Sequence, residues 1–192
     1  MPTIYPDWEI YIYHDTTVPS NIIDKLTKYK YVKMIYMFYS SIVKKMSWCF
    51  LVASETDVER YVIRNVDTRL SLREKSAVDD WIISRKKFHV MRDHPSHSQY
   101  AMTSGMWGCI RGAMPNMYSL LLIQRQQNGH TENMKFLNTV VWMKAKACVY
   151  QHDSFSCGHH GIDHTFPTNR VGLEYVGSVY VHKQRRQSDI HA

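Results

Sequence analysis

The positions of apolar residues in the first quarter of the chain alternate between the period of a strand and that of a helix. Residues 9–13 alternate apolar and polar side chains, and residues 31–36 are rich in β-branched and aromatic ones, so we expect a strand in each segment. Between them, Pro19 suits a first helical turn and predicts a helix through about Lys28. Over residues 40–53 apolar positions recur at helical spacing, which predicts an amphipathic helix.

The same alternation continues through the rest of the chain. Residues 60–64 predict a third strand, and the segment 71–74 (SLRE) fits a capping box that begins a helix. Residues 88–91 predict a fourth strand, 134–143 a helix and 147–151 a short strand. Strands that alternate with helices indicate an α/β fold, in which ligands bind beyond the carboxyl ends of the strands.

Composition narrows the class of protein. The chain has 192 residues, of which 44% are apolar and 21% charged, with only 8 Gly and 6 Pro. These values exclude a disordered or collagen-like chain and suit one globular domain. A net charge of +7 favours an anionic partner, which leaves nucleic acid, acidic lipid surfaces and phosphorylated small molecules open.

The sequence also bears on location. No apolar stretch approaches the length of a membrane span, and the first residues lack the pattern of a secretory signal, so we expect a soluble, cytoplasmic protein. The four cysteines form no C-x-x-C pair, and we expect them to be buried small side chains in a reducing compartment.

Four polar segments are candidates for chemistry. The first, 65–69 (NVDTR), follows the third strand; Asp67 there offers a carboxylate to a divalent cation, and Arg69 offers a guanidinium to phosphate oxygens. The alternative is an ordinary turn with Asx hydrogen bonds. The second, Arg92-Asp93-His94-Pro95 with His97, can bind sugar hydroxyls or supply a general base, or it is a plain surface turn.

The third segment is Ser104-Gly105-Met106-Trp107-Gly108, whose glycines let the backbone approach a ligand while the indole offers a flat apolar face. The alternative is a core tryptophan beside a tight turn. The fourth is the His-rich segment 152–164. A single metal ligand there, His152 or Asp153, competes with a zinc site, which would use the ligands Cys148, Cys157, His160 and His164.

Taken together and in order, these strings resemble a family of small GT-A-type glycosyltransferases found in bacteria and large algal viruses. The matching strings, given by residue number, are 48–50 (WCF), 58–70 (VERYVIRNVDTRL), 73–81 (REKSAVDDW), 88–97 (FHVMRDHPSH), 104–108 (SGMWG), 136–137 (FL), 152–153 (HD) and 166–177 (FPTNRVGLEYVG). The resemblance implies a single GT-A-like domain over residues 1–192, with a basic tail from about residue 183. It implies a mixed, mainly parallel central sheet flanked by helices.

The resemblance also implies an activity: transfer of a sugar from a nucleotide-sugar donor, with a UDP-sugar as the expected donor, to a glycan or other hydroxyl acceptor, with Mn²⁺ or Mg²⁺ as cofactor. Asp67 and His152 would be the metal ligands, and the catalytic loop would be Arg92, Asp93 and His94, with Asp93 as the candidate base. The donor-binding set would be His14, Asn65, Asp67, Arg69, Gly105, Trp107 and Arg170. If the chain is viral, it would work in the host-cell cytoplasm.

The chain departs from the family pattern at four positions. Asn65 replaces the first acid of the metal-binding D-x-D string, and Asn133 stands where an aspartate is expected. Cys49 replaces an arginine and Ser104 a glycine. Two alternatives therefore stand beside a glycosyltransferase: a relative that only binds nucleotide or glycan, and, less favoured, a basic nucleic-acid-binding module.

Overall fold

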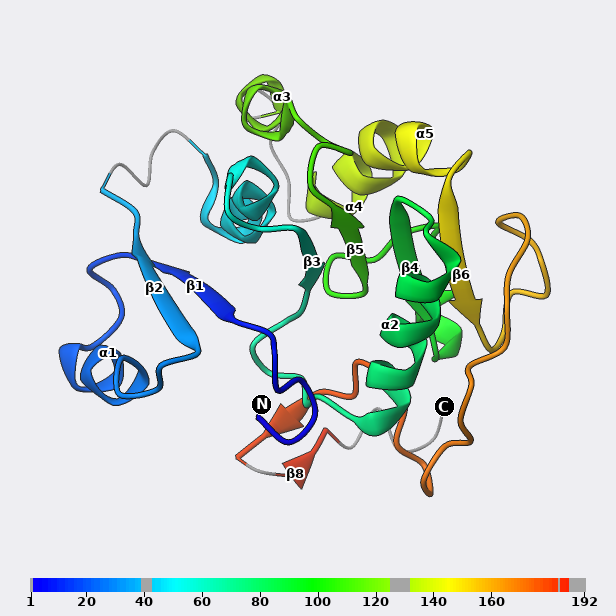
Figure 1. Cartoon of the computed structure of the whole chain (residues 1–192), viewed down its shortest axis with the longest axis horizontal. Helices are drawn as coiled ribbons and strands as arrows, with labels where there is room; N and C mark the ends of the chain where they lie inside the picture. The colour runs from blue at the N-terminus through cyan, green and yellow to red at the C-terminus, as the bar shows by residue number, and fades with distance from the viewer. Residues whose placement is uncertain (1, 39–42, 125–131, 183, 187–192) are drawn as a thin grey trace.

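The main sheet has four strands. The computed structural model describes residues 2–38, 43–124, 132–182 and 184–186 (Figure 1). The strands of the sheet, in spatial order, are β3 (Arg60–Ile63), β5 (Trp107–Ile110), β4 (Phe88–Arg92) and β6 (Val149–Asp153). β5 is antiparallel to both of its neighbours, whereas β4 and β6 are parallel. β3, β4 and β6 therefore run in one direction, downward in Figure 1, and their carboxyl ends share one edge of the sheet.

The expectation of an α/β fold with a mixed sheet is confirmed, but the expectation of a mainly parallel sheet is wrong. Two of the three strand pairings are antiparallel because β5 is inserted between β3 and β4. The glycines around Trp107 predicted a turn, yet Gly108 lies within the strand. A Cβ there would collide with the carbonyl oxygen of Tyr61 on β3, so the glycine permits close strand pairing.

Helices cover both faces of this sheet, since strand side chains alternate between two apolar cores. Helix α2 (Leu72–Ser84) packs one face around Trp81. The other face is covered by η1, α3 and the α4–η3–α5 helix. Their bounds are η1 Lys45–Ser54, α3 Met117–Gln124, α4 Glu132–Phe136, η3 Leu137–Val141 and α5 Trp142–Ala145.

The predicted helices are present with local changes. The N-cap of the predicted capping box is confirmed, because the Ser71 hydroxyl accepts a hydrogen bond from the Glu74 backbone N–H at 3.1 Å. The Glu74 carboxylate instead accepts from Arg64 at 2.7 Å. The helix expected over 134–143 contains a π-helical segment, η3. The helix expected over 40–53 is a 3₁₀ helix, η1, and residues 40–42 lie outside the described residues.

The remaining elements lie beside the main sheet. β1 (Ile10–His14) and β2 (Val32–Tyr36) form a separate parallel pair joined through α1 (Ser20–Leu26), as the sequence predicts. β7 (Tyr180–Val181) and β8 (Gln184–Arg185) pair near the carboxyl edge of the main sheet (Figure 1). Most of the predicted basic tail falls outside the described residues. No described helix combines the length and apolar character that crossing a bilayer requires.

Candidate functional site

The carboxyl edge of the main sheet gathers most of the predicted site. The loop 65–69 follows β3, Asp93 and His94 follow β4, and Gly105 lies just before β5. A late segment of the chain, residues 166–182, crosses this edge; we call it the strap. Its backbone joins the 65–69 loop where the N–H of Tyr180 donates to the carbonyl of Asp67 at 2.8 Å.

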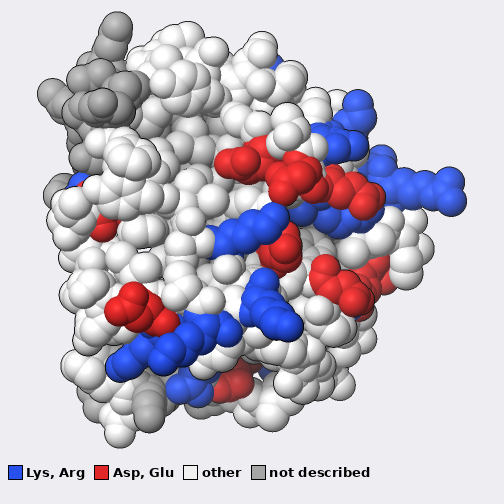
Figure 2. Space-filling model, turned by 60° about the vertical axis from the view of Figure 1, so that its left-hand side comes forward, with Lys and Arg blue, Asp and Glu red and all other residues white. Residues whose placement is uncertain are grey.

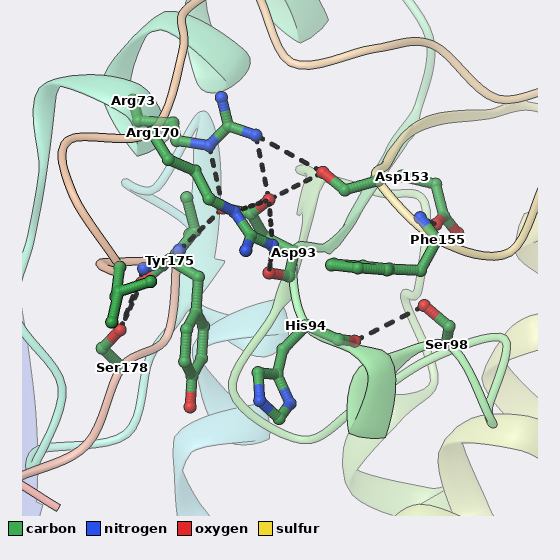
Figure 3. A network of polar contacts seen from close by, with 12 residues as sticks. Arg73, Asp93, His94, Ser98, Asp153, Phe155, Arg170, Tyr175 and Ser178 are labelled. Atoms are coloured by element: carbon green, nitrogen blue, oxygen red, sulfur yellow. Dashed lines mark hydrogen bonds and ion pairs between the residues drawn. The ribbon is translucent and has the colours of Figure 1, made fainter. Parts of the chain in front are cut away.

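Asp93 is the centre of a polar network that ties the strap to the sheet (Figure 3). Its two carboxylate oxygens accept hydrogen bonds from Arg73 at 2.8 and 2.9 Å. The hydroxyl of Ser154 donates at 2.7 Å and the backbone N–H of Val176 at 3.0 Å. Arg170 donates to the same carboxylate and to the Asp93 carbonyl. The side chain of Asp93 is fully buried, so its negative charge is satisfied entirely within the protein.

This geometry corrects the prediction that Asp93 is a general base. Burial alone would favour the neutral acid, but the hydrogen bonds from Arg73, Val176 and Ser154 outweigh it and hold the pKa of Asp93 below its usual range. Because both oxygens are occupied and none of the side chain is exposed, the carboxylate offers no open position to an acceptor hydroxyl. Asp93 is a positioning residue, and Arg170, predicted to bind the donor, is held by it.

Arg92 is also corrected from a catalytic to a structural role. It is fully buried, and its guanidinium pairs with Asp153. The same group donates to the carbonyl of Ala101 and to the side chain of Gln151, each at 2.5 Å. These partners join β4 to β6, and none of the guanidinium is exposed to a ligand.

His94 is nearly buried beside the strap. Its Nδ1 lies 2.7 Å from the hydroxyl of Ser96, which fixes the turn after β4. Its ring packs against that of Tyr175, with centroids 4.4 Å apart. In Figure 3 the two rings lie side by side and point away from the Asp93 carboxylate. His94 therefore contributes to the strap's packing, and the residue is only 7% exposed.

The 65–69 loop contrasts with this network because its side chains face solvent. Asn65, Asp67 and Arg69 are exposed, and Val66 is fully exposed. The turn expected as the alternative interpretation is present, but the backbone makes it. The carbonyl of Asn65 accepts from the N–H of Thr68 at 3.2 Å and from its hydroxyl at 2.8 Å.

The strap and the 104–108 segment hold this loop from two sides. The guanidinium of Arg69 lies 3.7 Å from the ring centroid of Tyr180 in the strap. On the other side, a Cβ at Gly105 would lie 2.7 Å from the side chain of Asn65. Gly105 is therefore needed for the close approach of the two segments. The structure brings together Asn65, Gly105 and Arg69, as the sequence predicts.

Trp107 is not part of this surface. Its side chain is fully buried in the core, with ring centroids 5.6 Å from Phe50 and 5.8 Å from Tyr61. The interpretation as a sugar platform is therefore wrong, and the alternative of a core tryptophan is correct. Alternation along β5 explains this, because Trp107 points into the larger of the two cores.

His152 is also in the interior, which argues against a metal shared with Asp67. Its Nδ1 lies 2.9 Å from Nε2 of His89, and its Nε2 lies 3.6 Å from a carboxylate oxygen of Asp80. Burial lowers the pKa of His152 to about 4. β6 and β3 are the outer strands of the sheet, three strand spacings or about 14 Å apart. His152, buried on one outer strand, and Asp67, exposed beyond the end of the other, are therefore not placed to share an ion.

No described residues form a metal centre by themselves. Within the described ranges, no group of three His, Cys, Asp or Glu side chains is placed to hold an ion. The alternative zinc site fails the same test. Of its candidate ligands, His160 places Nε2 2.9 Å from the carbonyl of Ser98, and Cys157 is exposed.

His14 and Asn133 lie apart from the carboxyl edge loop. His14 is buried at the end of β1, 5.5 Å from the ring of Tyr36, and has no contact with the 65–69 loop among the described interactions. Asn133 is a scaffold residue. Its amide donates to the carbonyl of Met46 and accepts from the hydroxyl of Ser47, both at 2.6 Å.

Sequence reasoning missed two residues of the site. Arg73 makes the paired contact with Asp93, and Tyr175 packs on His94. Arg73 lies in the first turn of a capped helix, a position that faces the carboxyl edge, so the capping box was a usable signal. Tyr175 had no local signal, because its contact depends on how the strap returns to the sheet.

Charge is mixed on the face that carries β1, β2 and α1. Figure 2 shows Lys and Arg side chains beside Asp and Glu side chains there. The ion pairs include Lys33 with Glu9 and with Asp57, and Lys45 with Asp15. This face offers no uniformly positive surface to a nucleic acid.

Comparison with known proteins gives no relative. No protein-family model, no curated protein and no solved structure matches this chain.

Proposed function

We propose that the chain is a glycosyltransferase that moves a sugar from a nucleotide-sugar donor, a UDP-sugar by its resemblance, to a glycan or other hydroxyl acceptor. The ordered strings of the sequence support this proposal. The observation that carries it is the exposed 65–69 loop at the carboxyl edge of three co-directional strands, where α/β folds bind ligands. The diphosphate of the donor would lie on this loop.

The chemistry required of the protein is stabilisation of negative charge on the departing diphosphate. Arg69 presents a guanidinium for phosphate oxygens at the loop, and the ring of Tyr180 fixes its position from behind. Gly105 has no side chain to collide with Asn65, so its backbone can lie close to the loop without displacing the Asn65 side chain. The strap, anchored through Asp93, keeps the turn at Asp67 in one conformation before the donor arrives.

The described residues alone do not form a site for a divalent cation. Asp67 offers one exposed carboxylate, but the described residues do not form a metal site, so they fit Mn²⁺ or Mg²⁺ poorly without oxygens from the donor. Binding measured with and without manganese determines whether the donor needs the metal.

The test uses the purified protein and a panel of nucleotide sugars, with and without manganese. Calorimetric titration measures donor binding, and a separate assay measures donor hydrolysis. We expect a UDP-sugar to bind, and Arg69→Ala to weaken binding tenfold or more. A further variant is Asp67→Asn. Its matched control is Asp24→Asn, since Asp24 is an exposed acid on α1, away from the loop. If the folded protein neither binds nor hydrolyses any donor, the proposal is wrong.

A second candidate, a relative that binds nucleotide or glycan without turnover, is favoured by one observation. The side chain of Asn133 donates to a carbonyl as well as accepting, which an aspartate at that position cannot do. The position is therefore built for asparagine. Asn65→Asp alone is the informative variant: activity that appears only in this variant supports the second candidate, and turnover by the parent protein excludes it.

A further inference from the structure

The amino edge of the main sheet, opposite the candidate site, carries a cluster of cations. Its six members come from the ends of α2, β5 and α5, and all are exposed: Arg85, Lys86, Lys87, Arg111, Lys144 and Lys146. We call this cluster the basic edge. It lies at the top of Figure 1, where α2 leads into β4 and α5 leads into β6.

Strand register brings these segments together although they are distant in sequence. Phe88 pairs with Val149 on one side and with Cys109 on the other. The pairing continues beyond the strands, since the N–H of Ile110 donates to the carbonyl of Lys87 at 3.0 Å and that of Phe88 to Cys148 at 3.2 Å. The residues before β4 therefore lie between those after β5 and those before β6.

The cations of the basic edge are a dense group that forms no ion pairs with described residues, whereas many other described cations are paired with acids. Eight other described Lys and Arg side chains form ion pairs with acids: Lys33, Lys45, Arg60, Arg64, Arg73, Lys75, Arg92 and Arg170. None of the six at the basic edge has an ion pair with a described residue. Glu59, whose backbone carbonyl accepts from the N–H of Arg111, pairs through its side chain with Arg60. The positive charge of this edge is thus uncompensated within the described protein, which attracts anions.

Apolar side chains are exposed among these charges. Ile83 is 76% exposed in the last turn of α2, and Met143 is 57% exposed on α5. Each is within two residues of a cation of the basic edge. Exposed aliphatic side chains beside lysines are typical of a surface that lies in the headgroup region of a bilayer, where the apolar groups insert and the ammonium groups meet anionic lipid.

We propose that the basic edge docks on an anionic membrane surface, with Ile83 and Met143 flanking it on the two sides of the sheet. A nucleic acid is the weaker match for this surface. Binding of single strands uses exposed rings for stacking, whereas Trp142, an aromatic residue beside Met143, packs against the core. The docking does not depend on the proposed glycosyltransferase activity.

The test is co-sedimentation of the full chain with vesicles of phosphatidylcholine alone or with about one third phosphatidylserine. We expect binding only to the anionic vesicles. The double variant Lys87→Glu with Lys144→Glu lowers this binding tenfold or more. The control, Lys28→Glu with Lys30→Glu near the end of α1, changes the net charge equally and lowers binding less than threefold.

Two further measurements separate the alternatives. Ile83→Ser with Met143→Ser keeps every charge, and we expect it to weaken vesicle binding several-fold, most visibly at high salt, where the electrostatic part is screened. The second measurement is a gel shift with single-stranded RNA, which tests whether the basic edge binds nucleic acid instead. Equal losses in the two charge variants, or binding of RNA without binding of anionic vesicles, would overturn the proposal.

Discussion

The ends of β3 and β4 lie at the same edge of one sheet and place an aspartate in opposite surroundings. Asp93, after β4, is buried and accepts hydrogen bonds from two arginines, a serine and a backbone N–H. Asp67, after β3, is exposed, and within the described part of the chain it is held through its backbone carbonyl, which accepts from the N–H of Tyr180.

This difference teaches that position at a strand end does not by itself make a residue available for chemistry. A carboxylate whose charge is neutralised inside the protein stabilises the fold and is closed to substrate. A carboxylate in an exposed turn adds little to stability and can meet a ligand. Substitutions at the two ends should therefore separate stability from binding.

The largest effect on stability is expected for Asp93→Ala. It leaves two guanidinium groups and the N–H of Val176 without their acceptor, and breaking a buried ion pair of this kind costs about 3–5 kcal/mol. Urea denaturation measures the loss in the free energy of unfolding. Asp24→Ala, on exposed α1, should stay close to the parent protein. A loss at Asp93 no larger than this control would contradict the buried network.

The same carboxylate gives a pH dependence. Because the pKa of Asp93 is lowered in the folded state, its stabilisation is complete above the ordinary value of 3.8 and is lost as the pH falls through the lower folded value. Asp93→Asn removes this contribution. The difference in unfolding free energy between the parent protein and Asp93→Asn should therefore shrink in acid, as thermal melts from neutral pH to below pH 3.8 would measure. A constant difference would show that Asp93 does not titrate in this way.

An intermediate effect is expected for Asn133→Asp. The new carboxylate would face the carbonyl of Met46 with no hydrogen to donate, at a cost of about 1–3 kcal/mol. Asn116→Asp is the matched control, since Asn116 is exposed just before α3. Denaturation curves for the two variants compare the same chemical change in a buried and an open position. If both variants match the parent protein, the hydrogen bonds of Asn133 are not structural.

The smallest effect on stability is expected for Asp67→Asn. The side chain is exposed, so the free energy of unfolding should change by no more than about 0.5 kcal/mol. Affinity for the nucleotide-sugar donor in the presence of Mn²⁺ should nevertheless fall tenfold or more, because Asp67 offers the carboxylate that would bind the cation. Calorimetric titration alongside denaturation checks both expectations. Unchanged donor affinity would remove the 65–69 loop from the proposed site.

The sequence predicted the elements better than the environment of their ends. The spacing of apolar residues and the helix-capping residues located five strands and α2, because these signals are local in the sequence. β5 was missed since Gly108 reads as a turn in sequence, although it serves close pairing with β3. The expectation that polar segments gather at the carboxyl ends of the strands correctly grouped the 65–69 loop with Gly105. It could not show that Asp93 is buried, because Arg170 and Val176 reach it from the strap, far along the chain.

The strap also determines how late in synthesis the carboxyl edge of the sheet can complete its folding. The carbonyl of Asp67 accepts a hydrogen bond from the N–H of Tyr180, and the carboxylate of Asp93 accepts one from the N–H of Val176. Both acceptors therefore depend on donors that lie much later in the chain. During synthesis the ribosome must release almost all of these residues before the two can meet. Pairings of such long sequence separation close late and slowly, which leaves the nascent carboxyl edge open to chaperones until translation reaches the strap.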